Sequence, residues 1–383
     1  MMRLDAATRD LDAPLAALDL AAFDANADDL ERRAGGLPIR VASKSLRCRE
    51  ALGRVLSRPG WSGVMAYALA EALWLVGTGV RDVFVAYPTA STSALAELAA
   101  DPLALSEITL AIDSAEHVAF LAQRVGPGVP LRVAIDVDCS VVLGRAHLGV
   151  RRSPVRTPAD AVAVVHAAQA AGFTVVGAMF YDAQVAGLPD ASPAIRWLKR
   201  RTLSELPDRR AAVIDALRAV ADLAFVNGGG TGSLESFGGT AGGSGVTEVA
   251  AGSGLYGPTL FDGYRAFRPR PALQFGLPAV RRPTPGVVTL FSGGYVASGE
   301  PGWSRVPSPV ARGLRLTRTE AAGEVQTPVR GPAADGVRMG ETVWFRGAKA
   351  GELLERFDGV HVVEADAVTA IWPTYRGEGR NFG

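Results

Sequence analysis

Lysine is scarce in this chain of 383 residues. The sequence has 40 lysine and arginine residues against 39 aspartates and glutamates, and only three of the basic residues are lysine: Lys44, Lys199 and Lys349. The formal net charge of +1 excludes the basic surplus that most nucleic-acid-binding proteins carry, so we expect no nucleic-acid partner. Because arginine is used nearly everywhere else, a position that keeps lysine is a candidate for chemistry that needs a removable proton.

Cysteine, histidine and long apolar runs are also lacking. Cys48 and Cys139 are the only two cysteines; they cannot make a disulfide framework, and we expect a reducing, cytoplasmic location. No run of about 18 apolar residues occurs and the first residues contain no apolar export signal, so we expect neither a membrane span nor export. The four histidines are scattered without metal-binding spacing, and we expect no metal site.

Strand-like and helix-like segments alternate between residues 38 and 257. Short runs rich in β-branched residues are separated by amphipathic stretches rich in Ala, Leu and Arg, which is typical of parallel strands connected by helices. Eight such units predict an α/β fold with a (β/α)8 TIM barrel rather than an open doubly wound sheet. The expected strands are 39–43, 63–67, 82–87, 108–113, 131–138, 175–182, 223–228 and 248–251.

Proline and glycine become dense after Pro258, and the runs that follow lack helical spacing apart from the short stretch 350–357. This texture predicts a C-terminal β-rich domain. We therefore divide the chain into an N-terminal segment, 1–20, whose strand is expected to join the β domain, a cofactor-binding barrel, 21–265, and the β domain, 266–383. The glycines of 238–245 are interpreted as a flexible linker.

Lys44 follows the first expected strand, and barrel enzymes collect their chemistry at the carboxyl ends of the strands. We expect its amine in the barrel mouth with apolar walls around its stem. Such surroundings disfavour the charged form and suit a Schiff-base nucleophile. An ordinary surface lysine is the alternative, and the residues alone leave both open.

Two glycine-rich runs, 227–233 and 251–254, follow the seventh and eighth expected strands. Consecutive glycines expose backbone N–H groups, and barrel enzymes commonly bind phosphate at these two loops. Together with a lysine after the first strand, the loops predict pyridoxal phosphate. The alternative is a phosphorylated sugar or nucleotide with Lys44 as a counter-ion, but the glycine spacing of a dinucleotide site is absent.

Two further loops carry candidate side chains. Tyr181 ends the sixth expected strand and is interpreted as a ring hydrogen-bond donor or acid/base group, with a structural tyrosine as the alternative. Gln184 follows in the same loop. His147 and Arg151 lie after the fifth strand; Arg151 with Arg152 either holds a carboxylate by a bidentate fork or belongs to the solvated surface.

Several segments resemble the alanine-racemase-like (fold type III) pyridoxal phosphate enzymes, in particular the branch of D-threonine aldolase and D-serine dehydratase. Arg40 precedes Lys44 by four residues, as in that family, and the N-terminal pattern of Asp19-Leu20, Phe23 and Asn26 is similar as well. An actinobacterial subgroup described as amino acid deaminase/aldolase resembles this chain in the segments 40–49, 144–154, 226–234, 248–271 and 323–328.

The resemblance implies the barrel with its C-terminal β domain, pyridoxal 5'-phosphate as cofactor, an amino acid substrate and a homodimer in which the partner's β domain completes the site. It implies Lys44 as the residue that binds the cofactor covalently. His147 stands where many relatives have an arginine, and we expect Lys44, His147 and Tyr181 to be the catalytic residues. Substrate-binding residues would be Arg151, Gln184 and Glu352. The cofactor-binding residues that it implies are Lys44, Arg40, Tyr181, Asn227, Gly229, Gly230, Thr231, Gly232, Ser253, Gly254 and Tyr256.

The sequence departs from the family in the β domain, where the family places a histidine and a cysteine that bind a divalent metal. The subgroup reads Phe-Arg-His-Ala-Lys-Ala-Gly-Glu-Leu-Cys-Glu-Arg-Phe, and this chain has Gly347 and Leu354 at the two ligand positions. Neither side chain binds a cation, so we expect no divalent metal. The amine of Lys349, in the same segment, is expected to replace part of the missing charge.

Three functions stay open at this point. The leading hypothesis is a pyridoxal phosphate lyase that acts on a β-hydroxy α-amino acid of D configuration, by retro-aldol cleavage or by β-elimination with deamination. The second is a metal-independent racemase, aldol-type transferase or biosynthetic tailoring enzyme that uses the same cofactor. The third is a non-catalytic carrier of the cofactor or a regulator.

Overall fold

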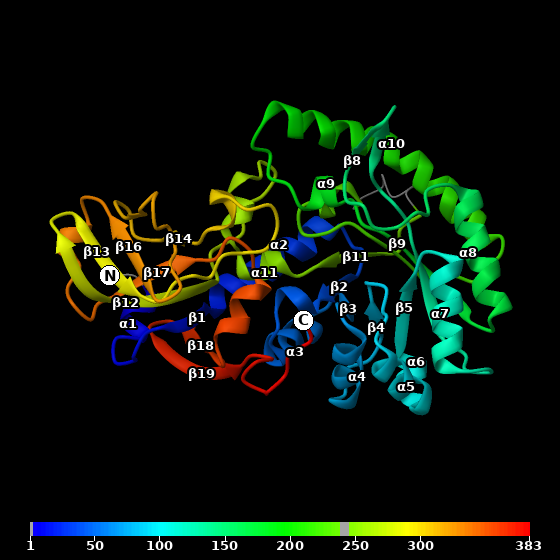
Figure 1. Cartoon of the computed structure of the whole chain (residues 1–383), viewed down its shortest axis with the longest axis horizontal. Coiled ribbons are helices and arrows are strands. Elements are labelled where there is room, and N and C mark those ends of the chain that lie inside the picture. The colour runs from blue at the N-terminus through cyan, green and yellow to red at the C-terminus, as the bar shows by residue number, and fades with distance from the viewer. Residues whose placement is uncertain (1–2, 238–244) are drawn as a thin grey trace. The chain divides into compact units, whose positions relative to one another are not determined.

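The computed structural model describes residues 3–237 and 245–383, so most of the expected glycine linker lies outside the described residues. The chain forms two compact units (Figure 1). The barrel unit consists of Leu30–Ser43, Arg54–Gly252 and Phe382–Gly383, and the sheet unit of Met1–Asp29, Lys44–Gly53 and Ser253–Asn381. The units differ from the predicted boundaries at residues 20 and 265 because the chain passes repeatedly from one to the other.

Eight parallel strands close into a barrel in the order β10, β11, β2, β3, β4, β5, β6, β9. All eight coincide with the predicted runs, and the predicted TIM barrel with a separate β domain is confirmed. The strands are largely buried because helices cover their outer side. Their bounds are β2 (Ile39–Ala42), β3 (Trp61–Ala66), β4 (Val83–Val85), β5 (Ile108–Ile112), β6 (Arg132–Asp136), β9 (Thr174–Phe180), β10 (Phe225–Gly228) and β11 (Glu248–Ala251).

Helices follow the strands along the outside of the barrel (Figure 1). Most begin at a hydroxyl side chain that accepts a hydrogen bond from the first turn; at Thr157, Asp160 completes a capping box. Inside the barrel, Phe84, Met179 and Phe225 pack in one apolar cluster, so the interior is a core rather than a pore. The helices are α4 (Leu69–Gly77), α5 (Thr92–Ala100), α6 (Pro102–Glu107), α7 (Ala115–Val125), α8 (Pro158–Ala170), α9 (Ala183–Ala186) and α10 (Pro193–Arg218).

The sheet unit is built on a nine-stranded sheet with the path β15, β16, β13, β12, β1, β18, β19, to which β17 and β14 are added beside β12. The N-terminal strand β1 lies inside it, antiparallel to β12 and parallel to β18. The bounds are β1 (Leu15–Asp19), β12 (Leu273–Thr284), β13 (Val287–Phe291), β14 (Ser308–Pro309), β15 (Arg315–Leu316), β16 (Gln326–Arg330), β17 (Thr342–Arg346), β18 (Gly359–Glu364) and β19 (Ala367–Pro373).

Some elements do not follow the pattern expected from the sequence. A hairpin of β7 (Val141–Leu143) and β8 (Ala146–Leu148) interrupts the connection between β6 and α8. The helix-like stretch at 350–357 forms the 3-10 helix η6 (Gly351–Arg356). The remaining α-helices are α1 (Arg3–Ala7), α2 (Leu20–Ala34), α3 (Arg49–Leu56) and α11 (Ser253–Tyr256).

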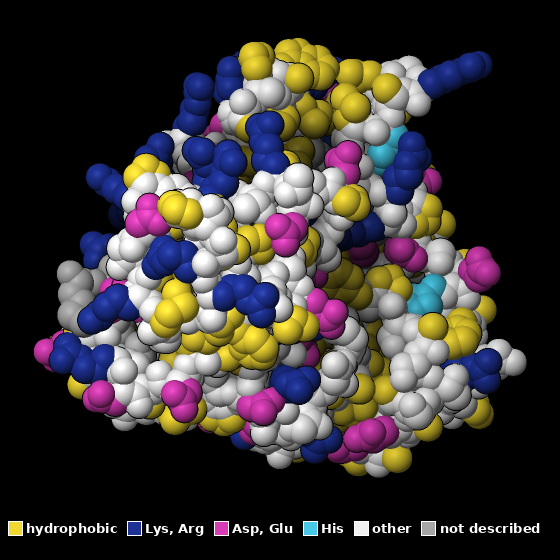
Figure 2. Space-filling view, turned by 60° about the vertical axis from the view of Figure 1, so that its left-hand side comes forward, with side chains coloured by type: hydrophobic (Ala, Val, Ile, Leu, Met, Phe, Trp, Pro, Cys, Tyr) yellow, Lys and Arg dark blue, Asp and Glu magenta, His cyan; other side chains and the backbone are white. Residues whose placement is uncertain are grey.

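Side chains of both charges share the surface seen in Figure 2. Lys and Arg side chains are interspersed with Asp and Glu over the face drawn in Figure 2, in keeping with the net charge of +1. Across 3–237 and 245–383, no helix has the length and apolarity needed to cross a bilayer.

Candidate active site

Lys44 lies in the 3-10 turn η1 (Ser43–Ser45), directly after β2, and its side chain is exposed. The apolar walls expected around its stem stay a prediction, whereas the exposure of the side chain has a structural reason. The reason is local: the turn begins as soon as β2 ends at Ala42 and takes Lys44 out of the inward and outward alternation of the strand.

The backbone of Lys44 is held firmly within the sheet unit. Arg47 donates from Nε to the Lys44 carbonyl at 3.4 Å and pairs through Nη1 with Glu355 at 2.5 Å. A Cβ at Gly351 would lie only 1.8 Å from the same carbonyl oxygen. Only glycine fits there, so η6 packs directly against the backbone of the lysine.

A polar cluster of Ser298, Lys349 and Glu352 lies in the same unit. The Ser298 N–H donates to Glu352 Oε2 at 2.8 Å, and Lys349 Nζ is 3.5 Å from Ser298 Oγ. Burial lowers the pKa of Lys349, and the positive charges of Arg305 and Lys44 lower it further. Burial opposes ionisation of Glu352, but the Ser298 hydrogen bond and the charge of Lys349 lower its pKa overall. The cluster therefore presents an ammonium and a carboxylate side by side.

The two positions at which the sequence resemblance predicted changed metal ligands carry side chains without a donor atom. Gly347 follows β17, and Leu354 is fully buried in η6. Within the described parts of the chain, no group of three or more His, Cys, Asp or Glu side chains is placed to hold a metal ion. The residues present do not fit a divalent cation.

Ser253, Gly254 and Tyr256 form the short helix α11, which follows β11. Tyr256 is buried, and its hydroxyl donates to the carbonyl of Leu46, two residues after Lys44, at 3.0 Å. Its burial raises the pKa of Tyr256 well above its usual value. Tyr256 is thereby connected, inside the sheet unit, to the segment that carries Lys44.

The glycine loop after β10 packs against its surroundings closely enough to require glycine. Gly229 has a φ of +71°, and a Cβ there would lie 2.6 Å from the ring of Phe237. A Cβ on Gly230 would lie 3.3 Å from Cε2 of Tyr181. The loop backbone thus passes directly beside the tyrosine at the end of β9, and its binding of a phosphate remains a prediction.

Thr231 links the two predicted phosphate loops within the barrel unit. Its Oγ1 accepts a hydrogen bond of 3.5 Å from the N–H of Gly252, and its carbonyl accepts one of 2.7 Å from Arg33. Asn227 is directed elsewhere, since its amide donates to Glu248 at 2.8 Å. The structure therefore brings together the loops after β10 and β11, while the N–H groups of Gly229 and Gly230 donate within the protein, to the Phe180 carbonyl at 3.2 Å and to Ser233 Oγ at 3.2 Å.

Tyr181 lies under a guanidinium group. Arg152 Cζ is 5.3 Å from the ring centroid of Tyr181 and 5.8 Å from that of Tyr87, which follows β4. Burial raises the pKa of Tyr181 to about 12, so its hydroxyl keeps its proton. Arg152 rather than Arg151 is the arginine that the structure places on these strand-end rings, and Arg151 forms no ion pair within residues 3–237 and 245–383.

Two carboxyl groups that the sequence analysis did not select lie at the ends of β6 and β9. Burial raises the pKa of Asp136 to about 7, with a further contribution from Asp113. Burial also raises the pKa of Asp182 to about 7; its Oδ1 accepts from Ser233 Oγ at 2.9 Å. Their positions at strand ends could have selected them from the sequence, because acids with a shifted pKa at the carboxyl ends of barrel strands are candidates for functional sites.

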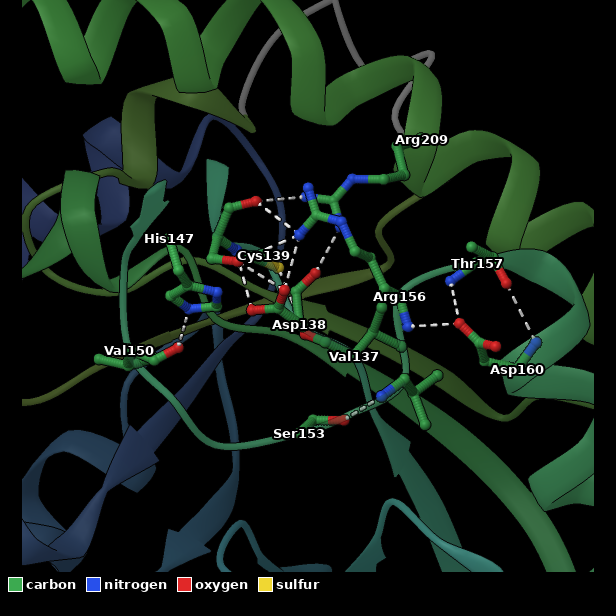
Figure 3. Close-up of polar contacts among 12 residues, drawn as sticks. Val137, Asp138, Cys139, His147, Val150, Ser153, Arg156, Thr157, Asp160 and Arg209 are labelled. Atoms are coloured by element: carbon green, nitrogen blue, oxygen red, sulfur yellow. Dashed lines mark hydrogen bonds and ion pairs between the residues drawn. The ribbon is translucent and has the colours of Figure 1, made fainter. Parts of the chain in front are cut away.

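His147 lies on β8 and is held by its own hairpin. Its Nε2 is 3.0 Å from the carbonyl of Val150 (Figure 3). At the base of the hairpin, Arg156 pairs with Asp138 at 2.7 Å, and Arg209 of α10 donates to the Asp138 carbonyl at 2.7 Å. The histidine is thus carried by a braced loop, and its catalytic role remains a prediction.

Gln184 braces this same loop. It is buried, and its Nε2 donates to the Cys139 carbonyl at 2.6 Å. A Cβ at Gly149, near the end of the hairpin, would lie 2.8 Å from Ser140 Cβ and 3.2 Å from Gln184 Oε1. These contacts explain the burial of Gln184, and its binding of substrate remains a prediction.

Arg40 lies inside the barrel near the amino ends of the strands. It donates from Nε to Glu248 at 2.6 Å and from Nη1 to the Asp82 carbonyl at 2.9 Å, and its Cζ is 5.0 Å from the Phe225 ring centroid. A Cβ at Gly63 would lie 2.4 Å from its Nη1. Contacts at this end of a barrel usually serve stability, and the predicted contact of Arg40 with a cofactor remains a prediction.

Comparison with solved structures identifies similar folds over nearly the whole chain. D-threonine aldolase from Filomicrobium marinum aligns with a TM-score of 0.76 and 22% identity, covering 96% of each chain. D-threo-3-hydroxyaspartate dehydratase from Delftia sp. HT23 aligns with a TM-score of 0.75 and 18% identity, covering 95% of this chain and 97% of that one. Alanine racemase from Bacillus anthracis aligns with a TM-score of 0.64 and 13% identity, covering 95% of this chain and 98% of that one.

The resemblance to alanine-racemase-like enzymes is thus confirmed at the level of the fold. No protein-family model matches the sequence. No curated protein sequence matches it either.

Proposed function

We propose that the chain is a pyridoxal 5'-phosphate enzyme of the lyase class, acting on a β-hydroxy α-amino acid of D configuration by retro-aldol cleavage or β-elimination. The observation that carries this proposal is the pair of glycine-rich loops joined by Thr231 in a barrel whose first strand is followed by Lys44. The sequence resemblance and the fold neighbours named as an aldolase and a dehydratase of D-amino acids support it.

In this proposal, Lys44 attaches the cofactor covalently, and the loops 229–232 and 252–254 surround its phosphate. When bound, the cofactor supplies an electron sink that stabilises negative charge on the substrate. Lys44 then takes and returns a proton at its amine, which an arginine cannot do. Tyr181 keeps its proton and donates a hydrogen bond from its hydroxyl.

We assign substrate binding to charged side chains of each unit. Arg152 offers a guanidinium fork to the substrate carboxylate. Lys349 and Glu352 offer an ammonium and a carboxylate to the β-hydroxyl group of the substrate. Arg151 and Gln184 are retained as further candidates for substrate binding, and His147 for catalysis.

The covalent role of Lys44 is tested by absorbance of the purified protein after addition of pyridoxal phosphate. We expect a band of protein-bound imine that sodium borohydride removes, and we expect Lys44→Ala to lack it. Lys199→Arg is the matched control, because Lys199 pairs with Asp190 at 2.8 Å and arginine can keep that pair. A band that persists in Lys44→Ala would contradict the proposal.

A second candidate keeps the cofactor but uses no metal: a racemase, an aldol-type transferase or a biosynthetic tailoring enzyme. Gly347 and Leu354, which replace the family's histidine and cysteine, favour it. Treatment with a chelator distinguishes the metal-dependent reaction from this one. Turnover that survives removal of divalent ions is expected here, and turnover that stops with the chelator and returns with a divalent ion would exclude it.

A non-catalytic carrier or regulator remains the third reading. A panel of D- and L-amino acids that shift the absorbance band without forming product would support it over both enzymes. We further propose a homodimer, which light scattering of the purified protein tests, and a reducing cytoplasm, which suits the two buried free cysteines.

A further inference from the structure

The sheet unit contains a pocket that the proposed function does not use. Its volume is about 380 Å³, within the usual range of small-molecule sites. The residues that line it are Trp303, Arg315, Leu316, Arg318 and Arg330. Every charged side chain in this lining is a guanidinium, although the whole chain has a net charge of only +1.

The three arginines of the pocket lie without an acidic partner among residues 3–237 and 245–383. Arg315 and Arg330 are direct register partners on β15 and β16, so like charges face each other across two strands, an unfavourable arrangement. In the described residues, neither they nor Arg318 form an ion pair. Other arginines of the same unit do pair with carboxylates: Arg282 with Asp335, Arg338 with Glu341, Arg346 with Asp262 and Arg376 with Asp358.

The backbone around the pocket is tightly packed. A Cβ at Gly331, next to Arg330, would lie 2.0 Å from the carbonyl oxygen of Gly313. The N–H of Thr317 donates to the Pro328 carbonyl at 3.3 Å. The strands therefore hold the bases of the three arginine side chains close together before any ligand binds, which lowers the entropy lost on binding.

Trp303 supplies an aromatic surface beside these charges. It lies in the 3-10 helix η4 (Trp303–Arg305), and its side chain is 54% exposed. An indole ring stacks on a planar heterocycle in a manner tolerant of the identity of the base. Leu316 adds an apolar group to the lining. The pocket thus combines a stacking surface with three phosphate-binding forks.

We propose that this pocket binds a small phosphate ester with a planar aromatic ring, of the class of nucleoside mono- and diphosphates. Guanidinium groups bind phosphate bidentately. A dianion between Arg315 and Arg330 replaces their mutual repulsion by attraction. The site lies on β15, β16 and η4, apart in sequence from every residue assigned to the cofactor or the substrate, so it stands or falls independently of the proposed function.

Titration of the purified full-length protein with ADP tests the proposal, followed by isothermal titration calorimetry and by tryptophan fluorescence. We expect saturable binding that weakens at high salt. The double variant Arg315→Gln/Arg330→Gln should weaken binding by about tenfold or more, as expected for losing charge-assisted hydrogen bonds. Trp303→Phe should remove the fluorescence change. Arg312→Gln, an exposed arginine outside the lining, is the matched control and should bind as the unaltered protein does.

Three results would overturn the proposal. One is ADP binding that the double variant leaves unchanged. Another is inorganic phosphate binding as tightly as ADP, because the aromatic ring would then contribute nothing. The third is a change of oligomeric state in the double variant, measured as molecular mass by light scattering, while the affinity for ADP stays the same. The arginines would then contact a second copy of the chain rather than a phosphate ester.

Discussion

Lys349 is a charged side chain in the segment between β17 and η6. Its ammonium lies beside Ser298 and near the carboxylate of Glu352. Lysine cannot polarise a hydroxyl as strongly as a divalent ion, but it can hold one by a charge-assisted hydrogen bond. Its proposed role is therefore in binding the substrate rather than in attaching the cofactor.

The variant Lys349→Met tests this role. Because one charge-assisted hydrogen bond is lost, we expect the KM of a β-hydroxy amino acid to rise by about tenfold. The imine absorbance band should stay unchanged, since the cofactor is not held by this residue. Lys349→Arg keeps the charge and should recover part of the affinity. Equal KM values in Lys349→Met and the unaltered protein would contradict the role.

The buried carboxyl group of Asp182 predicts how the stability of the fold depends on pH. Its pKa is raised to about 7 by burial, whereas it is near 3.9 in an unfolded chain. The folded state therefore binds more protons between these values, so the stabilising contribution is complete below the unfolded pKa and is lost as the pH rises through about 7.

The variant Asp182→Asn removes this titration while keeping an acceptor for Ser233. We expect the free energy of unfolding of the unaltered protein to fall, relative to Asp182→Asn, by about 2 kcal/mol between pH 4 and pH 7, measured by urea denaturation. Asp160→Asn is a control, because the contribution of Asp160 to stability is expected to change with pH in the opposite direction. Hydrogen bonds from Thr157 and Arg156 lower the pKa of Asp160, so its contribution is lost as the pH falls.

At the scale of elements, the hairpin of β7 and β8 is the insertion that carries His147. It is fixed to the barrel unit through Arg156 and Arg209 and through the close approach of Gly149 to Ser140. These contacts come from α10, from the segment before α8 and from the hairpin itself. The orientation of His147 therefore depends on packing far from it in sequence.

Gly149→Ala tests this anchoring. The added Cβ would meet Ser140 at 2.8 Å, and the φ of +151° is unfavourable for alanine, so we expect a loss of about 1–3 kcal/mol in unfolding free energy and lower turnover. Gly144→Ala is the matched control on the same hairpin, because no atom lies within 4 Å of the added Cβ. In Gly144→Ala, the φ of +57° alone should lower the free energy of unfolding by about 1 kcal/mol. Equal effects of the two variants would argue against the anchor.

At the scale of the whole molecule, Arg40 connects parts of the barrel that lie far apart in sequence. It is buried between Glu248 on β11 and Asp82 before β4. Arg40→Met leaves Glu248 buried without its partner, and we expect a loss of about 3–5 kcal/mol in thermal or urea unfolding. Adding Glu248→Gln to it should recover part of that loss. If Arg40→Met folds with full stability but loses the imine band, Arg40 serves the cofactor instead.

The eight barrel strands could be predicted because each is a short apolar run buried on both faces and separated from the next by a helix. The hairpin could not: its strands are three residues long, and Val142 and Leu143 are exposed. Part of the candidate site could not be predicted from the sequence either. Arg151 and Arg152 are adjacent in a loop without periodicity, so only the packing on Tyr87 and Tyr181 distinguishes them. The exposure of Lys44 follows from where β2 ends, which composition does not determine.

Each unit is assembled from three separate stretches of the chain, and Lys44 begins one stretch while the strand before it ends another. A single genetic crossover between this gene and a relative would therefore leave both units as hybrids of two parents. Neither unit can therefore be exchanged whole by one crossover, whereas point substitutions can change either unit by itself.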